Sequence, residues 1–285
     1  MKENKIWNDY LPEDMQEHWT VYECLKESED SSTFLVKETA TGILCVLKWG
    51  RNRQTEFLRH EMEIMKKMAD RKLSGIPKAY RIFEENGEVY LVREYIEGMS
   101  LAQMVLQKGG ISEAEICRIS RKICQTAEQF QNPDEPMIHR DIKPENIVVT
   151  PGGEVVFIDF GTMRSYKKDG SRDTFVVGTR GTAAPEQYGY TQTDQRTDVY
   201  AIGQTMLYMV SESYEMNQLS ECAVSRRMKK IIEKACSFEP DKRYGDAAQL
   251  RRAVEKCQAN NRKKVYKKAG WKNLCVSNES GNAGS

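Results

Sequence analysis

The chain lacks several features that would assign it to a specialised class of protein. Its 285 residues include 43 basic and 42 acidic side chains, so the net charge of +1 creates no field of one sign to attract nucleic acid or an anionic membrane. No apolar run approaches the length of a membrane-spanning helix, and the polar N-terminal residues contain no stretch of signal-peptide length. We therefore expect a cytoplasmic protein that neither inserts into a membrane nor binds nucleic acid.

Cysteine pairs of the kind that bind zinc or build a disulfide framework are absent as well. The eight cysteines include no CxxC pair, which favours free or buried thiols in a reducing compartment. The sequence also has no internal repeat, and this excludes architectures that depend on repetition.

What the chain does contain is a change of pattern along its length. Residues 20–50 alternate apolar and polar side chains, which predicts strands, and further strands are expected at about 79–84 and 88–95. A helix is expected at 54–69, with an apolar face made of Phe57, Leu58, Ile64, Met65 and Met68. Later helices are expected near 100–107, 112–131, 195–211, 225–237 and 246–258. Strands first and helices afterwards predict an α+β fold with two unequal lobes.

Polar side chains gather at one point of this pattern. The sequence reads His-Arg-Asp-Ile-Lys-Pro-Glu-Asn from residue 139 and Ile-Asp-Phe-Gly from residue 158. The apolar runs 146–149 and 155–158 predict a hairpin that would bring three polar groups to one end: Asp141, Asn146 and Asp159. Two carboxylates and an amide in this arrangement suit the holding of metal-bound phosphates beside a hydroxyl nucleophile.

These residues resemble the catalytic loop and the metal-binding loop of the eukaryotic-like (Hanks-type) protein kinases, in the style of the bacterial members. The resemblance runs from about Trp19 to about Cys257, and its motifs occur in the family's order. It implies a bilobal kinase-like fold with these parts: an N-terminal extension (1–18), a kinase domain (19–258, with a small lobe at 19–95 and a large lobe at 99–258) and a basic, polar and partly disordered tail (259–285).

Asp141 is the candidate catalytic base, because a substrate hydroxyl needs an acceptor that orients it and takes its proton. An isolated aspartate of this kind often only caps a turn. Its neighbours Lys143 and Asn146 favour the catalytic interpretation. Lys143 would neutralise charge on the moving phosphoryl group, and by resemblance its position indicates the serine/threonine class of kinase.

Asn146 and Asp159 are the expected magnesium ligands, since Mg²⁺ prefers oxygen donors and needs few protein ligands beside phosphates. By resemblance, Lys48 at the end of an apolar strand would hold the α- and β-phosphates of ATP and pair with a glutamate on the following helix. Glu61 is the expected partner, because Glu63 lies about 200° further round that helix and should face elsewhere.

Residues 178–186 match the end of a kinase activation segment. By resemblance, Thr179 would contact the catalytic base, Asp198 would anchor the backbone of the catalytic loop, and Glu186 would form a buried pair with Arg243. A buried carboxylate needs a partner, and arginine provides a two-point one. These roles are structural, and they make the match to the family more specific.

Arg140 adds a regulatory hypothesis. An unpaired arginine beside the catalytic base invites a phosphate on the segment 162–177 to order it. Thr174 and Ser171 are the candidates for modification, and Asp173 would supply part of the same charge without modification. Self-association for autophosphorylation would fit this arrangement.

One departure from the family pattern is the glycine-rich phosphate loop, which is missing. Lys26, Ser28 and Ser31 stand where three glycines would lie, within the acidic segment 26–33. Glycines there would let backbone N–H groups approach the phosphates, so side chains and carboxylates should weaken ATP binding.

The second departure is Arg93, which takes the place of an apolar gatekeeper residue behind the adenine pocket. A guanidinium there needs an acid partner, for which Glu61 and Asp159 are the candidates. A one-residue slip in the alignment would instead put Arg93 on the solvent face. By resemblance, the residues around the adenine pocket would be Val46, Glu94, Ile96 and Val148.

Together these features predict a serine/threonine protein kinase that transfers the γ-phosphoryl group of ATP to protein hydroxyls, with Mg²⁺ as the metal. The alternative is a pseudokinase, a fold kept for binding nucleotides or partners without turnover. The segment 26–33 and Arg93 favour it, whereas Lys48 and Asp141 oppose it. A small-molecule phosphotransferase of related architecture would lack the segment 178–186, and this argues against that class.

Overall fold

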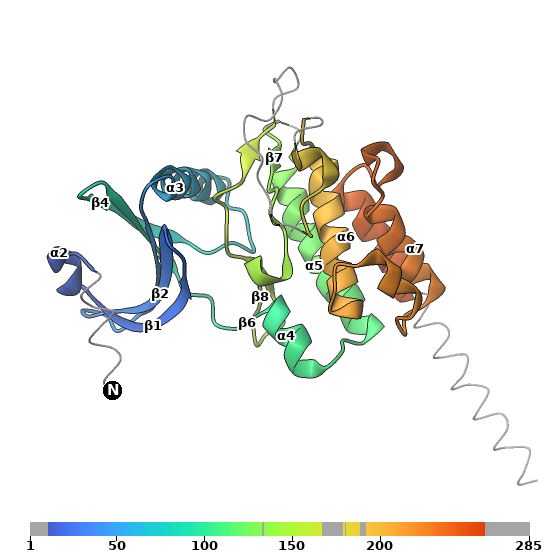
Figure 1. The fold of residues 1–285 in the computed structure, drawn as a ribbon, viewed down its shortest axis with the longest axis horizontal. Helices are drawn as coiled ribbons and strands as arrows, with labels where there is room; N and C mark the ends of the chain where they lie inside the picture. Colours follow the sequence, from blue (N-terminus) through green and yellow to red (C-terminus); the bar gives the residue numbers. More distant parts are fainter. Residues whose placement is uncertain (1–10, 133, 167–178, 180, 189–191, 260–285) are drawn as a thin grey trace, which may run out of the picture.

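The computed structural model of the protein describes residues 11–132, 134–166, 179, 181–188 and 192–259. A five-stranded antiparallel sheet forms one side of the molecule, and most of the helices form the other (Figure 1). The strands come first in the chain and most helices follow. The expectation of an α+β fold with two unequal lobes is therefore confirmed.

The small lobe is built from five strands in the spatial order β1-β2-β3-β5-β4, and each neighbouring pair is antiparallel. The strands are β1 (Trp19–Glu27), β2 (Ser31–Glu38), β3 (Leu44–Gly50), β4 (Ala79–Glu85) and β5 (Glu88–Glu94). Along β2, buried and partly exposed side chains alternate over most of the strand, as a period of two requires. Asn86 and Gly87, with φ angles of 51° and 81°, make the tight turn between β4 and β5.

The residues before β1 cover one face of this sheet. The short helix α2 (Glu13–Gln16) buries Met15, and Leu11 just before it is also buried. Both belong to a hydrophobic cluster that includes Leu47 of β3. The described part of the expected N-terminal extension thus packs on the small lobe, while residues 1–10 lie outside the described residues.

The helix α3 (Gln54–Asp70) contacts both lobes (Figure 1). Its Leu58 packs with Leu91 on the other face of the sheet, and its Met68 joins the core of the large lobe. Phe57, expected on the buried face, is 38% exposed. It is rotated by about 100° from Leu58, so the two side chains do not share one face of the helix.

The large lobe consists mainly of helices that begin at polar caps. Its elements are α4 (Leu101–Lys108), α5 (Glu113–Phe130), α6 (Gln195–Ser211), α7 (Arg226–Ala235), a helix at 247–259, and the short 3₁₀ helices η1 (Pro144–Asn146), η2 (Pro185–Tyr188), η3 (Met216–Ser220) and η4 (Pro240–Lys242). The side chains of Ser100, Ser112, Asp194 and Ser225 accept hydrogen bonds from backbone N–H groups in the first turns of α4 to α7.

The hairpin expected between residues 146 and 158 is present. β8 (Ile147–Val149) pairs antiparallel with β9 (Val155–Phe157), and β6 (Met99–Ser100) lies beside β8. The N–H of Ile158 donates to the carbonyl of Asn146 at 3.0 Å. This hydrogen bond holds the two ends of the hairpin together. Asn146, just before β8, and Asp159, just after β9, lie at these ends.

Two further short strands of the large lobe pair with each other. β7 (Met137–Ile138) precedes the residues 139–146, and it pairs antiparallel with β10 (Arg164–Ser165). β10 begins the segment on which the regulatory hypothesis rests, whose residues 167–178 lie outside the described residues.

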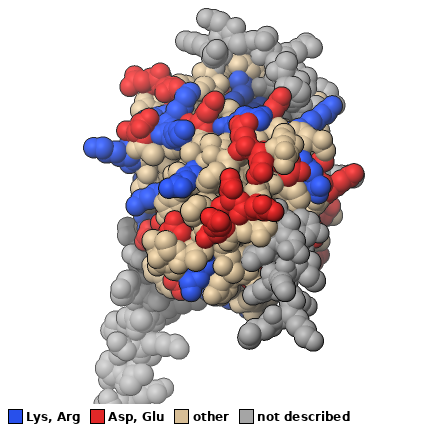
Figure 2. Space-filling model, turned by 90° about the vertical axis from the view of Figure 1, so that its left-hand side faces the viewer, with Lys and Arg blue, Asp and Glu red and all other residues tan. Residues whose placement is uncertain are grey.

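Charged side chains of both signs are spread over the face of the molecule that the small lobe presents (Figure 2). The seven cysteines within the described residues are free thiols, as the sequence predicted: Cys24, Cys45, Cys117, Cys124, Cys222, Cys236 and Cys257. Within the described ranges, no helix combines the length and the apolar character needed to cross a bilayer.

Gly98→Ala should lower the free energy of unfolding in urea by about 2 kcal/mol or more. Gly98 lies between β5 and β6 with a φ of 152°, and a Cβ there would stand 2.4 Å from the carbonyl oxygen of Val149. The control is Gly109→Ala, where φ is 60° and nothing lies within 4 Å of the added Cβ. That change should cost only about 1 kcal/mol. Equal losses in the two variants would show that the close approach is unimportant.

Candidate active site

Lys48 lies at the centre of the predicted site. Its Nζ is 2.7 Å from Oε1 and 2.8 Å from Oε2 of Glu61, and 3.3 Å from Oδ2 of Asp159. The lysine comes from β3, the glutamate from α3 and the aspartate from the residues after β9. Glu61 is buried whereas Glu63 is exposed, so the expected choice of partner is confirmed. Three segments from both lobes meet in this cluster of charges.

The charge state of the cluster follows from burial and from the ammonium group. Burial raises the pKa of Asp159, but the Lys48 ammonium and the N–H of Gly161 outweigh burial and lower the pKa to about 2. Burial raises the pKa of Glu61, against the lowering effect of Lys48. Asp159 is therefore ionised at neutral pH, and its side chain is 40% exposed, which leaves it accessible to a cation.

Asp141 follows β7, and three polar side chains surround its carboxylate. Asn146 Nδ2 donates to Oδ2 at 2.9 Å and to the main-chain oxygen at 3.0 Å, and Lys143 Nζ lies 2.8 Å from Oδ2. Thr179 Oγ1 donates to Oδ1 at 2.8 Å and accepts from Lys143 Nζ at 2.5 Å. The expected contact between Thr179 and the candidate base is present. The carboxylate is thus oriented from both sides.

Asp198 of α6 holds the loop that carries Asp141. Its carboxylate accepts hydrogen bonds from the N–H of His139 at 3.0 Å and of Arg140 at 2.9 Å, which is the contact expected from the sequence. Burial raises the pKa of Asp198 to about 6, although both N–H donors lower it. Arg140 has a φ of 67°, a strained value for a residue with a Cβ, and its carbonyl accepts from Gln187 Nε2 at 2.7 Å.

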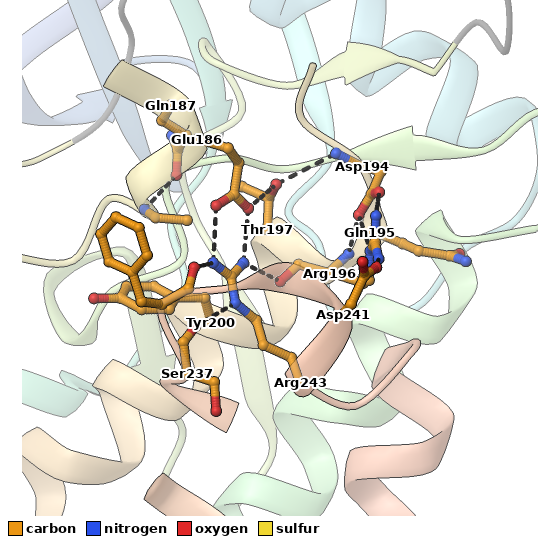
Figure 3. A network of polar contacts seen from close by, with 12 residues as sticks. Glu186, Gln187, Asp194, Gln195, Arg196, Thr197, Tyr200, Ser237, Asp241 and Arg243 are labelled. Carbon is orange, nitrogen blue, oxygen red and sulfur yellow. Dashed lines mark hydrogen bonds and ion pairs between the residues drawn. The ribbon is translucent and has the colours of Figure 1, made fainter. Parts of the chain in front are cut away.

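Glu186 and Arg243 form the buried pair that the sequence predicted (Figure 3). Two parallel hydrogen bonds of 2.7 and 2.8 Å join the guanidinium to the carboxylate. Backbone carbonyls at Ser237, Phe238 and Arg196 accept the remaining donors. With its donors satisfied in this way, the buried guanidinium fixes the end of the activation segment against η4.

His139 is buried among aromatic rings. The ring centroids of Phe157, Phe160 and Phe130 lie 5.4, 5.6 and 6.1 Å from its own. Both of its ring nitrogens are buried without a hydrogen-bond partner among the described residues. Burial lowers the pKa of His139 to about 4, so the imidazole is neutral at physiological pH.

Arg93 is 4% exposed, so the alternative in which it faces solvent is wrong. Its Nη1 donates to the carbonyl of Glu94 at 3.0 Å, and its buried Nε has no hydrogen-bond partner among the described residues. In the described part of the chain it forms no ion pair with Glu61 or Asp159, which lie around Lys48. Burial lowers the pKa of the guanidinium, against the opposite effect of these carboxylates.

The residues expected around an adenine ring come from both lobes. Val46 on β3 and Val148 on β8 are buried, and Ile96 after β5 is partly buried. Glu94 uses its carboxylate within the small lobe, where Oε2 accepts from the N–H of Lys78 at 2.9 Å. A ligand beside Glu94 would therefore meet its main chain rather than a free carboxylate.

The residues in place of a glycine-rich loop form a tight turn between β1 and β2. Lys26 pairs with Thr33 across the two strands, and the N–H of Ser28 donates to the carbonyl of Ser31 at 2.8 Å. Asp30 Oδ1 accepts from Asn52 Nδ2 at 2.7 Å, which ties the turn to the residues after β3. Several polar groups of the turn are thus engaged with other parts of the small lobe.

The structure gives Arg140, the residue of the regulatory hypothesis, a partner within the large lobe. Arg140, expected to be unpaired, donates from Nε to the carbonyl of Thr162 at 2.7 Å. The candidates Ser171, Asp173 and Thr174 lie outside the described residues.

Sequence reasoning missed two polar contacts of this site. His60 Nε2 lies 2.5 Å from the carbonyl of Met163, which links α3 to the segment after Asp159. Gln187 links the residues after the activation segment to the loop at Arg140. A histidine next to Glu61 and a glutamine next to Glu186 were visible signals, but their partners lie far away in the sequence.

We also compared the sequence of the chain with those of known families and proteins. The protein kinase domain family matches residues 20–264. The chain is 29% identical over 253 residues to "Serine/threonine-protein kinase D" of Synechocystis sp., covering 78% of this chain and 48% of that protein. It is 25% identical over 233 residues to "Serine/threonine-protein kinase cds1" of Schizosaccharomyces pombe, covering 72% and 49%.

A third relative is more similar over a shorter stretch. The chain is 35% identical over 147 residues to "Probable serine/threonine-protein kinase CPE1738" of Clostridium perfringens, covering 51% of this chain and 21% of that protein. The chain thus matches about half the length, or less, of these relatives.

Arg243→Met should lower the free energy of unfolding by about 3 to 5 kcal/mol, because it leaves the buried carboxylate of Glu186 without a charged partner. The control is the neighbouring Lys242→Met, whose ion pair with Glu239 joins side chains that are 65% and 61% exposed. That change should cost at most about 1 kcal/mol. Urea denaturation measures both, and similar losses would contradict the argument.

His139→Phe should make the protein more resistant to acid. A folded-state pKa of about 4, below the ordinary 6.5, means that neutral His139 supports folding above pH 6.5 and that this support is lost as the pH falls toward 4. Between pH 7 and pH 5, wild type should lose about 2 kcal/mol more unfolding free energy than the variant. His18→Phe at an exposed position is the control. An identical pH dependence of wild type and His139→Phe would refute the assignment.

Proposed function

We propose that this chain, which belongs to the protein kinase family, transfers the γ-phosphoryl group of ATP to serine or threonine hydroxyls of proteins. The observation that carries the proposal is the joint placement of two groups. Lys48 is held by Glu61 and Asp159, and the carboxylate of Asp141 is oriented by Asn146 and its neighbours.

Asp141 acts as the acceptor that orients the attacking hydroxyl and receives its proton. Its Oδ1 and Oδ2 are held by Thr179, Asn146 and Lys143, so the carboxylate keeps one orientation. Lys143 places a positive charge beside the same carboxylate, where it offsets negative charge on the transferred group. Lys48 supplies the second positive charge and binds phosphate oxygens.

The family implies the use of ATP and usually of Mg²⁺. The side chains present fit a hard divalent cation, because Asp159 is ionised and accessible. Asn146 directs its Nδ2 toward Asp141, which leaves its oxygen as a donor to a metal. A bound Mg²⁺ would neutralise phosphate charge at this point. Asn146 and Asp159 are therefore the residues that we assign to the metal.

We assign the adenine ring to the space between the lobes, with apolar contacts from Val46, Val148 and Ile96 and main-chain contact at Glu94. The kinase is of the bacterial style, and its segment 26–33 acts as a degenerate phosphate loop. The side chains of its polar turn keep backbone N–H groups further from the phosphates than glycines would, and this weakens nucleotide binding.

We also propose the domain bounds, the location and the regulation of the chain. The kinase domain covers residues 19–258, between an N-terminal extension at 1–18 and a polar tail at 259–285. The seven described free thiols suit a cytoplasmic location. Autophosphorylation by a second copy on Thr174 is the proposed regulatory event.

A pseudokinase is the second candidate, and Arg93 is the observation that favours it. A buried guanidinium at the back of the nucleotide site occupies space that an apolar side chain leaves to the base. The ion pairs of Lys48 and the orientation of Asp141 favour an active enzyme instead.

Asp141→Asn should reduce phosphate incorporation into a general protein acceptor, with radiolabelled ATP and Mg²⁺, by about a hundredfold or more. Nucleotide binding should stay within a fewfold of wild type, because the amide that replaces the carboxylate keeps the shape of the side chain. The label should appear on serine and threonine in acid hydrolysates.

Asp70→Asn, at the exposed C-terminal end of α3, is the matched control and should keep wild-type activity. Equal incorporation by wild type and Asp141→Asn would remove the enzyme assignment. Nucleotide binding without any transfer by wild type would favour the pseudokinase.

A further inference from the structure

Arg93 lies on the face of the sheet that carries Lys48. In the register between β3 and β5, Lys48 is opposite Leu91 and Val46 is opposite Arg93. Directly opposed residues of an antiparallel pair point to the same face, as do residues two apart along a strand. Arg93 is therefore next to Lys48 on that face, about 7 Å further toward the connector between the lobes at residues 94–98.

The guanidinium of Arg93 carries more N–H donors than the hydrogen-bond acceptors around it can satisfy. Among the described residues, it donates only one hydrogen bond, from Nη1 to the carbonyl of Glu94, although arginine carries five N–H donors. Its Nε is buried and has no hydrogen-bond partner within the described part of the chain. A buried cation is costly unless hydrogen-bond acceptors surround it. The carboxylates of Glu61 and Asp159, which raise the pKa of Arg93, do not fill this role, because both are engaged with Lys48.

The position of Arg93 decides which part of a nucleotide it would meet. In the proposed function Lys48 binds phosphates, so the base extends away from Lys48 toward the connector. Arg93 and the carbonyl of Glu94 then face an edge of that base. The carbonyl accepts one hydrogen bond from the guanidinium, whose other N–H groups have no acceptor among the described residues, so donors outnumber acceptors at this corner of the site.

Purine bases differ in the substituent at C6, which is the group that would contact Arg93. Adenine carries an amino group at C6, which is a donor, whereas guanine and hypoxanthine carry an oxygen there, which is an acceptor. Arginine binds the O6 and N7 atoms of guanine through its planar fork. An amino group at C6 would instead meet the N–H groups of Arg93.

We infer that Arg93 makes the nucleotide site bind 6-oxo purine nucleotides at least as tightly as ATP, so that guanine-type nucleotides also serve as phosphoryl donors. The inference rests on the proposed function for the location of the nucleotide. It adds to that proposal the base that the site selects and the residue that selects it.

The test is a set of binding titrations with the magnesium complexes of ATP, GTP and inosine triphosphate. The last of these has the 6-oxo group but no 2-amino group, so it isolates the contact at C6. Wild type should bind inosine triphosphate and GTP at least as tightly as ATP. In Arg93→Met, the ratio of affinities should move toward ATP by about tenfold.

Two further variants support this comparison. Arg93→Lys keeps the charge but not the planar fork, and its ratio should lie between those of wild type and Arg93→Met. Arg81→Met, on the exposed side of β4, is the control and should keep the wild-type ratio. Arg93→Met should fold, because methionine places no charge in the buried site. Thermal melting checks this.

Several outcomes would overturn the inference. Tighter binding of ATP than of inosine triphosphate by wild type would do so, as would an unchanged ratio in Arg93→Met. An equal loss for all three nucleotides would identify Arg93 as a phosphate contact. An equal gain, or no binding by wild type, would identify it as a plug. Phosphate transfer is measured on the same samples, so absent transfer with the expected binding ratios would reject the proposed function alone.

Discussion

The ion pair between Lys48 and Glu61 is the contact on which the rest of the site depends. It joins β3 to α3, and α3 packs on the sheet of the small lobe and on the core of the large lobe. Asp159, from the large lobe, approaches the same ammonium. Because charges of opposite sign attract strongly where water is excluded, these groups define one relative position of the two lobes. Such a pair contributes geometry more than stability, since the cost of removing both charges from water offsets much of the attraction.

Buried charged side chains also fix the loop of the large lobe that carries Asp141. Asp198 accepts two backbone N–H groups of that loop, and Arg243 holds Glu186 with two parallel hydrogen bonds. These contacts maintain a backbone that is strained at Arg140. Each of these buried charges is matched by a partner. Arg93 departs from this rule, and for that reason it is the most informative residue of the proposed nucleotide site.

Much of the architecture could be predicted because it is encoded locally. Period-two and helical patterns placed β4, β5 and α3 within one or two residues, and they located the region of β1 to β3 without separating the three strands. Serine and aspartate caps mark the starts of the later helices. Phe57 was assigned to the wrong face because pattern reasoning counts apolar residues, whereas the exposed fraction depends on the angular position relative to the sheet. The partner of His60 was unpredictable, because the Met163 carbonyl is brought to it by the fold alone.

The amino-acid sequence by itself determined the class of chemistry. The class of chemistry was readable from four residue types in a characteristic order: Lys48, Asp141, Asn146 and Asp159. Helical geometry selected Glu61 rather than Glu63 as the partner of Lys48. Only the tertiary structure decided whether Arg93 faces solvent or the interior, and which acceptor its guanidinium finds. The reason is physical: a strand pattern indicates which residues share a face, but burial and hydrogen bonding depend on what the rest of the chain places opposite that face.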